Sequence, residues 1–194
     1  MDANFTVIYD ACVLYPAPLR DLLMQLALTG LFQARWTDRI HDEWTRNVLK
    51  NRPDLTMSQL NRTRLMMNAA VDDALVSGYE DIIDSLELPD PDDRHVLAAA
   101  ISSQANYIIT FNLKDFPAAI LDKFEIEAQH PDRFISDSID LNSAVVLASA
   151  EACRQRLKNP PKSVEEYLEI LLNQGLPNST KLLRQLGYNG WRSS

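Results

Sequence analysis

Four acidic side chains lie at the end of a predicted strand or near the start of a predicted helix. They are Asp10 in NFTVIYD, Glu43 in RIHDEW, Asp93 in PDPDDRHVLAAA and Asp115 in YIITFNLKDF. In an open α/β sheet, ligands bind in the crevice at the carboxyl ends of the strands, so acids that are far apart in the sequence can meet there. Mg²⁺ prefers carboxylates and water as ligands, and Mn²⁺ accepts the same groups. The four acids therefore indicate a phosphodiesterase that uses a divalent metal.

The segments around these acids alternate between strand-like and helix-like patterns. Near-continuous apolar runs, typical of strands buried on both faces, cover residues 5–9 and 107–111. Shorter strands are expected at 31–36 and 124–128. Helices are expected at 19–30, 39–50, 56–75 and 92–104. This alternation predicts an α/β fold with a mostly parallel central sheet and helices on both faces.

The strand signals stop at about residue 131. Helices are expected at 140–157, 163–172 and 179–186, separated by NPPK and GLPN. A chain of 194 residues can bury one substantial core and a modest appendage. The sequence thus predicts one domain over residues 1–130, which carries all four acids, and a helical C-terminal extension over residues 131–194.

Asp93 is expected to point into the fold. Successive residues of a helix turn by about 100°, which places Asp93 at the centre of the apolar stripe formed within residues 96–101, and His95 on the opposite face. An inward, unpaired carboxylate is costly, and a bound cation would remove that cost. The competing interpretation is helix capping, which suits Asp90 and Asp92 better than Asp93.

The other acids are less informative one by one. Asp10 closes an apolar strand, where a turn or capping role is equally open. Glu43 lies on the shoulder of the apolar stripe of its helix, as expected at the rim of a site, although most such glutamates are only solvated. Asp115 follows the second buried strand, with Thr110 and Asn112 beside it, and alone it is ordinary turn chemistry. The hypothesis rests on the set.

The charge distribution qualifies the choice of substrate. A net charge of -8 argues against a protein that coats nucleic acid through bulk electrostatics. Basic residues nevertheless gather around Glu43: Arg35, Arg39, Arg46, Lys50, Arg52, Arg62 and Arg64. Beside a metal site, Arg39, Arg46 and Lys50 are candidates for holding substrate phosphates. The alternative is a set of solvated helix faces.

Taken together, these motifs resemble the PIN-domain nucleases, especially the VapC-type toxins of bacterial and archaeal toxin–antitoxin pairs. The resemblance covers residues 5 to about 117 and is carried by VIYDACVLYP, DEW, DDRHVLAAA and TFNLKDF. It implies a catalytic and metal-binding quartet of Asp10, Glu43, Asp93 and Asp115. It also implies that Thr110 and Asn112 are accessory polar positions near the metal. Many family members have an acid where this chain has Asn112. The resemblance therefore makes Asp115 the expected acidic ligand after the second buried strand, and it leaves open whether one or two metal ions bind.

The resemblance further implies a function and partners. The expected activity is endoribonucleolytic cleavage of RNA in a single-stranded stretch, with Mg²⁺ or Mn²⁺ lowering the pKa of a bound water. A small antitoxin protein is the expected inhibitor, and a homodimer is the expected assembly. No apolar run reaches the roughly 18 residues of a spanning helix. The N-terminal residues, with an acid at position 2, have neither signal nor transit character, so the cytoplasm is expected.

Other classes of protein fit the sequence less well. Cys12 and Cys153 lack CxxC spacing, so neither a disulfide framework nor a zinc site is predicted, and buried thiols are expected. A phosphatase with an aspartyl nucleophile would need a DxDxT pattern after the first strand. A nucleotide-binding module would need a glycine-rich loop, yet the chain has five glycines and no such motif. A catalytically decayed PIN-like scaffold or RNA-binding protein is the remaining alternative, and Asn112 favours the scaffold.

Overall fold

The computed structural model describes residues 5–190, and the side chains of residues 5–187. Asp2, on which the expectation about signal and transit peptides depends, lies outside the described residues. Two compact units are formed: one by Met1–Tyr15 and Phe32–His130, the other by Pro16–Leu31 and Pro131–Ser194. The domain boundary at residue 130 stays a prediction, and contact grouping places residues 16–31 with the C-terminal helices.

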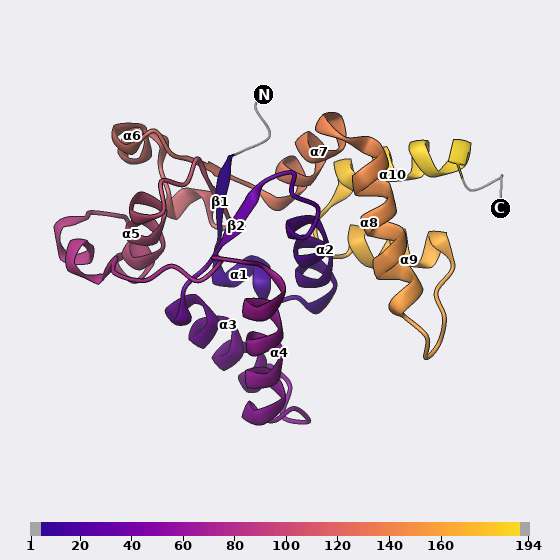
Figure 1. The fold of residues 1–194 in the computed structure, drawn as a ribbon, viewed down its shortest axis with the longest axis horizontal. Helices are drawn as coiled ribbons and strands as arrows, with labels where there is room; N and C mark the ends of the chain where they lie inside the picture. Colours follow the sequence, from indigo (N-terminus) through magenta and orange to yellow (C-terminus); the bar gives the residue numbers. More distant parts are fainter. Residues whose placement is uncertain (1–4, 191–194) are drawn as a thin grey trace. The chain divides into compact units, whose positions relative to one another are not determined.

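The first unit is built on an all-parallel, four-stranded sheet with the order β2-β1-β3-β4. Strands β1 and β2 lie side by side in this sheet (Figure 1). Its strands are β1 (Thr6–Tyr9), β2 (Gln33–Arg35), β3 (Tyr107–Ile109) and β4 (Glu127–Gln129). The two central strands carry fully buried side chains at consecutive positions, as in Val7 and Ile8. Consecutive burial requires cover on both faces, which is typical of parallel sheets. The predicted α/β class with a parallel sheet is confirmed.

The register of the two central strands positions the residues that follow them. Tyr9 of β1 is paired with Ile109 of β3. The backbone N–H of Asp10 continues this pairing by donating to the carbonyl oxygen of Ile109 at 3.1 Å. Asp10 and Thr110 therefore leave the sheet side by side at its carboxyl edge, although 100 residues separate them in the chain.

Short helices connect the strands of this unit. The α-helices are α1 (Ala11–Leu14), α3 (Asp38–Asn51), α4 (Met57–Ala70), α5 (Arg94–Ser102) and α6 (Ala118–Leu121). The 3₁₀ turns are η1 (Glu80–Ser85), η2 (Pro91–Asp93), η3 (Leu113–Asp115) and η4 (Asp122–Phe124). The hydroxyl of Thr37 caps α3, and a capping box of Thr56 and Gln59 opens α4. Helix α5 packs on β1 and β3.

A buried polar network joins α3 to α4, which lie side by side (Figure 1). Trp44 Nε1 donates to His41 Nδ1 at 2.9 Å, so this nitrogen is an acceptor. His41 Nε2 then carries the proton and donates to Asn68 Oδ1 at 2.9 Å, where Trp36 Nε1 also donates at 2.7 Å. Burial is the main cause that lowers the pKa of His41. The network therefore holds this imidazole neutral between the two helices.

In the described residues of the second unit, helices are joined by loops, one of which contains an isolated β-bridge between Lys158 and Pro161. The helices of this unit are α2 (Ala17–Ala27), α7 (Pro131–Leu141), α8 (Ser143–Arg156), α9 (Val164–Leu172) and α10 (Pro177–Gly190). The single helix expected at 140–157 is wrong at its start, because α7 ends at Leu141 and the side chain of Asn142 caps α8. No helix is expected from the sequence between residues 131 and 139, but α7 begins at Pro131, because proline suits the first turn of a helix. Across the described residues, none of the helices has the length and apolar character needed to cross a membrane.

Candidate functional site

Asp10 is buried at the carboxyl end of β1, with 4% of its surface exposed. It occupies the position before α1 but makes no side-chain capping bond there. Instead, its Oδ2 atom accepts hydrogen bonds from Thr110 Oγ1 at 2.7 Å and from Cys12 Sγ at 3.0 Å. No described residue donates to its Oδ1 atom. The protein thus holds one carboxylate oxygen of Asp10, and because this side chain makes no capping bond, the structure does not support the capping interpretation.

The two donors to Asp10 are themselves held by the loop that follows β3. Thr110 Oγ1 accepts from the backbone N–H of Asn112 at 3.0 Å, and Cys12 Sγ accepts from that of Phe111 at 3.2 Å. Burial, and next the charge of Asp10, raise the pKa of the Cys12 thiol, which keeps it protonated and able to donate. The sequence interpretation singled out Thr110 but missed Cys12, which had only its spacing of two residues from Asp10 as a signal.

Asp93 is half-buried at the end of η2 and makes no capping bond. Asp90 takes that role, since its Oδ1 atom accepts from the N–H of Asp92 at 2.9 Å. Burial, and then the charges of four neighbouring acids, raise the pKa of Asp93 to about 7; these neighbours are Asp10, Asp90, Asp115 and Glu43. The structure therefore places Asp93 within the electrostatic reach of all three other acids that the sequence selected.

Glu43 projects from α3 with 25% of its side chain exposed, and its Oε1 atom faces two bases. This oxygen lies 3.6 Å from Nε of Arg39 and 2.8 Å from Nε2 of His95. The expectation that His95 lies on an outer helix face was wrong, because His95 is fully buried together with residues 96–100. A helix that is buried on all sides has no solvent-exposed face, so the position of its apolar stripe does not predict which side chains are buried.

Asp115 closes η3 and is partly buried. Its backbone N–H donates to the carbonyl oxygen of Asn112 at 3.0 Å, so the turn fixes both residues after β3. The side chain of Asn112 is exposed and makes no hydrogen bond with any described residue. Asn112 supports the site through its backbone, as the donor to Thr110.

The donor chemistry of these acids suits a hard divalent cation. After burial, the named causes that raise the pKa of Asp93 are the charges of other carboxylates. Within residues 5–190, however, no three His, Cys, Asp or Glu side chains converge into a ready-made ligand group. Mg²⁺ usually takes only one or two protein carboxylates and completes its shell with water and substrate phosphate. The residues therefore fit a cation that is held loosely until substrate contributes.

A row of basic side chains continues from Glu43 along α3. Arg39, Arg46 and Lys50 stand at four residues before and at three and seven residues after Glu43, so all four lie on one face of the helix. The three bases are exposed. We call this set, Arg39, Arg46 and Lys50, the α3 basic row.

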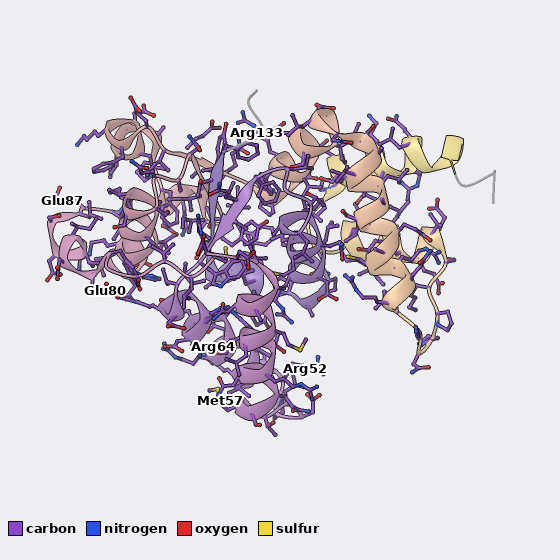
Figure 2. All side chains as sticks on the ribbon, viewed as in Figure 1. Arg52, Met57, Arg64, Glu80, Glu87 and Arg133 are labelled. Atoms are coloured by element: carbon purple, nitrogen blue, oxygen red, sulfur yellow. The ribbon has the colours of Figure 1, made fainter. Side chains whose placement is uncertain are left out.

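Two other bases of the same region, Arg52 and Arg64, are labelled in Figure 2, and both are paired with acids. Arg64 of α4 binds Asp38 at 3.2 Å and Asp42 at 2.7 Å, and Arg52 binds Asp54 at 2.6 Å. The pairs of Arg64 join α4 to α3, and the pair of Arg52 lies in the connection between these helices. In both cases the guanidinium group already has a carboxylate partner, so it is less available to a phosphate. Two of the seven bases in the cluster of the sequence, Arg52 and Arg64, are therefore paired with acids, and three form the α3 basic row. The remaining two, Arg35 and Arg62, belong to neither group.

The fold and the site define an α/β protein of parallel topology with an acidic site at the carboxyl edge of its sheet. The chain belongs to the PIN domain family, whose profile matches residues 6–114 and ends one residue before Asp115. A second profile, described as the VapC50 C-terminal domain, matches residues 131–185. The family resemblance inferred from the sequence is confirmed.

One relative gives a closer comparison. The protein named "Putative ribonuclease VapC50" from Mycobacterium tuberculosis (strain ATCC 25618 / H37Rv) is 36% identical over 121 residues, which are 60% of this chain and 68% of the relative. No solved structure matches the chain.

Proposed function

We propose that this protein is an endoribonuclease that hydrolyses RNA phosphodiester bonds with Mg²⁺ or Mn²⁺. The observation that carries the proposal is the position of Asp93, whose pKa is raised by burial and by the charges of Asp10, Asp115 and Glu43. Such mutual repulsion is expected of carboxylates that are arranged for a cation. Membership of the PIN domain family and the name of the VapC50 relative support RNA as the substrate.

The residues of the chain have separate tasks in this mechanism. Asp10, Glu43, Asp93 and Asp115 would hold the cation, which when bound supplies an acidified water and charge for the attacked phosphate. Thr110 and Cys12 fix one oxygen of Asp10 and leave the other available. Asn112 holds Thr110 through its backbone N–H.

The α3 basic row is proposed to contact the RNA backbone. Arg46 and Lys50 are exposed and form no ion pair with a described residue, so a phosphate can bind them without breaking one. The net charge of -8 repels RNA from the rest of the surface, which favours a selective enzyme. Single-stranded RNA suits such a row because its backbone is accessible.

We further propose that the protein is the toxin of a toxin–antitoxin pair, with a small antitoxin protein as its inhibitor and a homodimer as its assembly. Support comes from the match of its C-terminal residues to the VapC50 C-terminal domain and from the VapC50 relative. The cytoplasm, where RNA is available, is the proposed location.

The test is cleavage of total cellular RNA with Mg²⁺ or Mn²⁺ by wild type, Asp10→Asn and Asp93→Asn. Asp92→Asn is the matched control, because Asp92 is an exposed acid next to Asp93 in the chain and its backbone N–H is what Asp90 caps, so its side chain is not needed for the turn. Discrete fragments that disappear with a chelator and in both site variants, but persist in Asp92→Asn, support the nuclease. Equal cleavage by Asp93→Asn and wild type would contradict it.

A non-catalytic PIN-like scaffold is the second candidate. Two features favour it: Asn112 is a neutral amide at a position where the family resemblance implies an acid in many members, and no three ligand side chains converge among the described residues. Titration with Mn²⁺ separates the two functions. Saturable binding that is lost in Asp10→Asn supports the enzyme, and no binding at millimolar Mn²⁺ supports the scaffold.

A further inference from the structure

His95 is a fully buried imidazole with no aligned hydrogen-bond partner. Neither Nδ1 nor Nε2 has such a partner among the described residues. Nε2 nevertheless lies 2.8 Å from Oε1 of Glu43, a hydrogen-bond distance at which the oxygen stands out of line with the N–H bond. A buried polar group without a partner destabilises the folded state. The fold nevertheless keeps the imidazole of His95 next to the carboxylate of Glu43, which indicates that His95 has a role at the site.

Glu43 needs a partner to define its position. It comes from α3, whereas Asp93 precedes α5 and Asp10 ends β1, so no shared element fixes its place relative to them. Its only other ion pair among the described residues is with Arg39 at 3.6 Å, and Arg39 is 45% exposed. Exposed pairs of this kind contribute little and hold a side chain loosely.

His95 has the rigidity that Arg39 lacks. It lies two residues after Asp93 in α5, and the helix around it is fully buried from His95 to Ala100. Its ring therefore moves only with the helix that follows Asp93. A donor at Nε2 ties Glu43 of α3 to that helix.

We propose that His95 is a positioning residue, which holds Oε1 of Glu43 through Nε2 and leaves Oε2 for the cation. This role rests on the proposed function. It matches the arrangement at Asp10, where Thr110 and Cys12 hold Oδ2 alone. Hydrogen bonds at such sites are often poorly aligned without ligand and tighten in the complex. Buried donors to metal-binding carboxylates are worth 10- to 100-fold in metal affinity.

A purely structural role makes a different prediction. If His95 only fills space, an apolar side chain of similar volume should serve as well, because it removes two unpaired polar atoms. Methionine provides that volume without a donor. Glutamine keeps a side-chain N–H donor in the place of Nε2. Comparison of His95→Met with His95→Gln therefore distinguishes a role in filling the core from a role in positioning Glu43.

The experiment measures the Mn²⁺ dissociation constant by titration and the melting temperature in chelator. We expect His95→Met to lose about 10- to 100-fold in Mn²⁺ affinity while melting at or above the wild-type temperature. His95→Gln should recover most of the affinity. In the Glu43→Ala background, His95→Met should have no further effect, because the residue it acts through is gone. Cleavage by His95→Met should show a lower kcat with an unchanged KM for RNA.

Three results would overturn the role of His95. They are wild-type Mn²⁺ affinity in His95→Met, an equal loss in the Glu43→Ala background, and an equal loss of affinity in His95→Gln. Failure of the wild type to bind Mn²⁺ and to cut RNA would instead overturn the proposed function, and the role of His95 with it. The two failures are thus distinguished by the wild-type measurement.

Discussion

Thr110 donates its hydroxyl hydrogen to Asp10 across a separation of 100 residues, with 2.7 Å between Oγ1 and Oδ2. The contact follows from sheet register, because Tyr9 and Ile109 are paired and the next residue of each strand is Asp10 or Thr110. Asp10 and Thr110 are both buried. The carboxyl edge of the sheet thus orients the acid before any ligand is present.

Replacing Thr110 by valine tests this orientation. The hydroxyl is exchanged for a methyl group of similar size, which leaves Asp10 Oδ2 with Cys12 alone and the Asn112 N–H without an acceptor. We expect a loss of about 1–3 kcal/mol in the free energy of unfolding and about 10- to 100-fold in Mn²⁺ affinity. Urea denaturation and Mn²⁺ titration measure both. Thr110→Ser keeps the donor and should restore metal affinity; a serine variant as weak as the valine variant would refute the prediction.

Asp93 should make the metal-free protein less stable as pH rises. Its pKa is raised from an ordinary value of 3.8 to about 7 in the fold, so the folded state binds more protons than the unfolded state between these values. Stability is therefore full below about pH 4 and falls as pH rises towards 7. In chelator, Asp93→Asn should unfold at higher urea than wild type at pH 8 and at similar urea at pH 4. Added Mn²⁺ should reverse the order at pH 8. A destabilised asparagine variant at pH 8 would contradict this account.

His41 should act in the opposite direction. Burial is the main cause that lowers its pKa below the ordinary 6.5, so the unfolded chain takes up a proton more readily. Its contribution to stability is full above about pH 6.5 and is lost as pH falls towards its pKa in the fold. Because Asp93 titrates over an overlapping range, the difference between wild type and His41→Gln must be followed at each pH. This difference should shrink from pH 8 to pH 5, and a constant difference would show that His41 does not titrate with unfolding.

The sequence was sufficient where one local pattern determines one outcome. The apolar runs at 5–9 and 107–111 have a single stable use, as buried parallel strands, and the acids after them must then meet at one edge. Asp90 as the cap of η2 was equally predictable, because aspartate before proline is a strong helix start.

The sequence was insufficient where long-range packing decides. Helix α5 is buried on all sides, so periodicity could not reveal that His95 lies against Glu43. Cys12 became a donor to Asp10 only because the loop after β3 closes over it, through the N–H of Phe111. Likewise, Asn142 caps a helix instead of continuing one, a choice made by local hydrogen bonding that helix propensity does not encode.

Asp132 should be the main polar determinant of the helical unit. It is 4% exposed in α7 and accepts from the N–H groups of Asn178 and Ser179 at 3.0 and 2.8 Å, at the start of α10. Ser179 Oγ also donates to it at 2.7 Å. Asp132→Ala leaves these donors unpaired and should cost at least about 2 kcal/mol. Urea denaturation measures the loss. Asp137→Ala, at an exposed position on the same helix, is the control and should change stability by less than about 0.5 kcal/mol; equal effects would show that the buried cap is not special.

The α3 basic row should determine how strongly RNA binding depends on salt. Each phosphate contact to single-stranded nucleic acid contributes a slope of about -0.7 in log K against log salt. Arg46→Gln and Lys50→Gln should each reduce the slope by about this amount and raise KM for RNA, while kcat and Mn²⁺ affinity stay unchanged, because neither base belongs to the acidic site. Lys123→Gln is the charge-matched control. Lys123 is exposed in η4, just before β4, so it lies near the amino ends of the strands, whereas the acids lie at the carboxyl ends. Cleavage rates and RNA binding measured at several salt concentrations separate the three variants. An equal change of slope in Lys123→Gln would mean that net charge, and not the row beside Glu43, attracts the substrate.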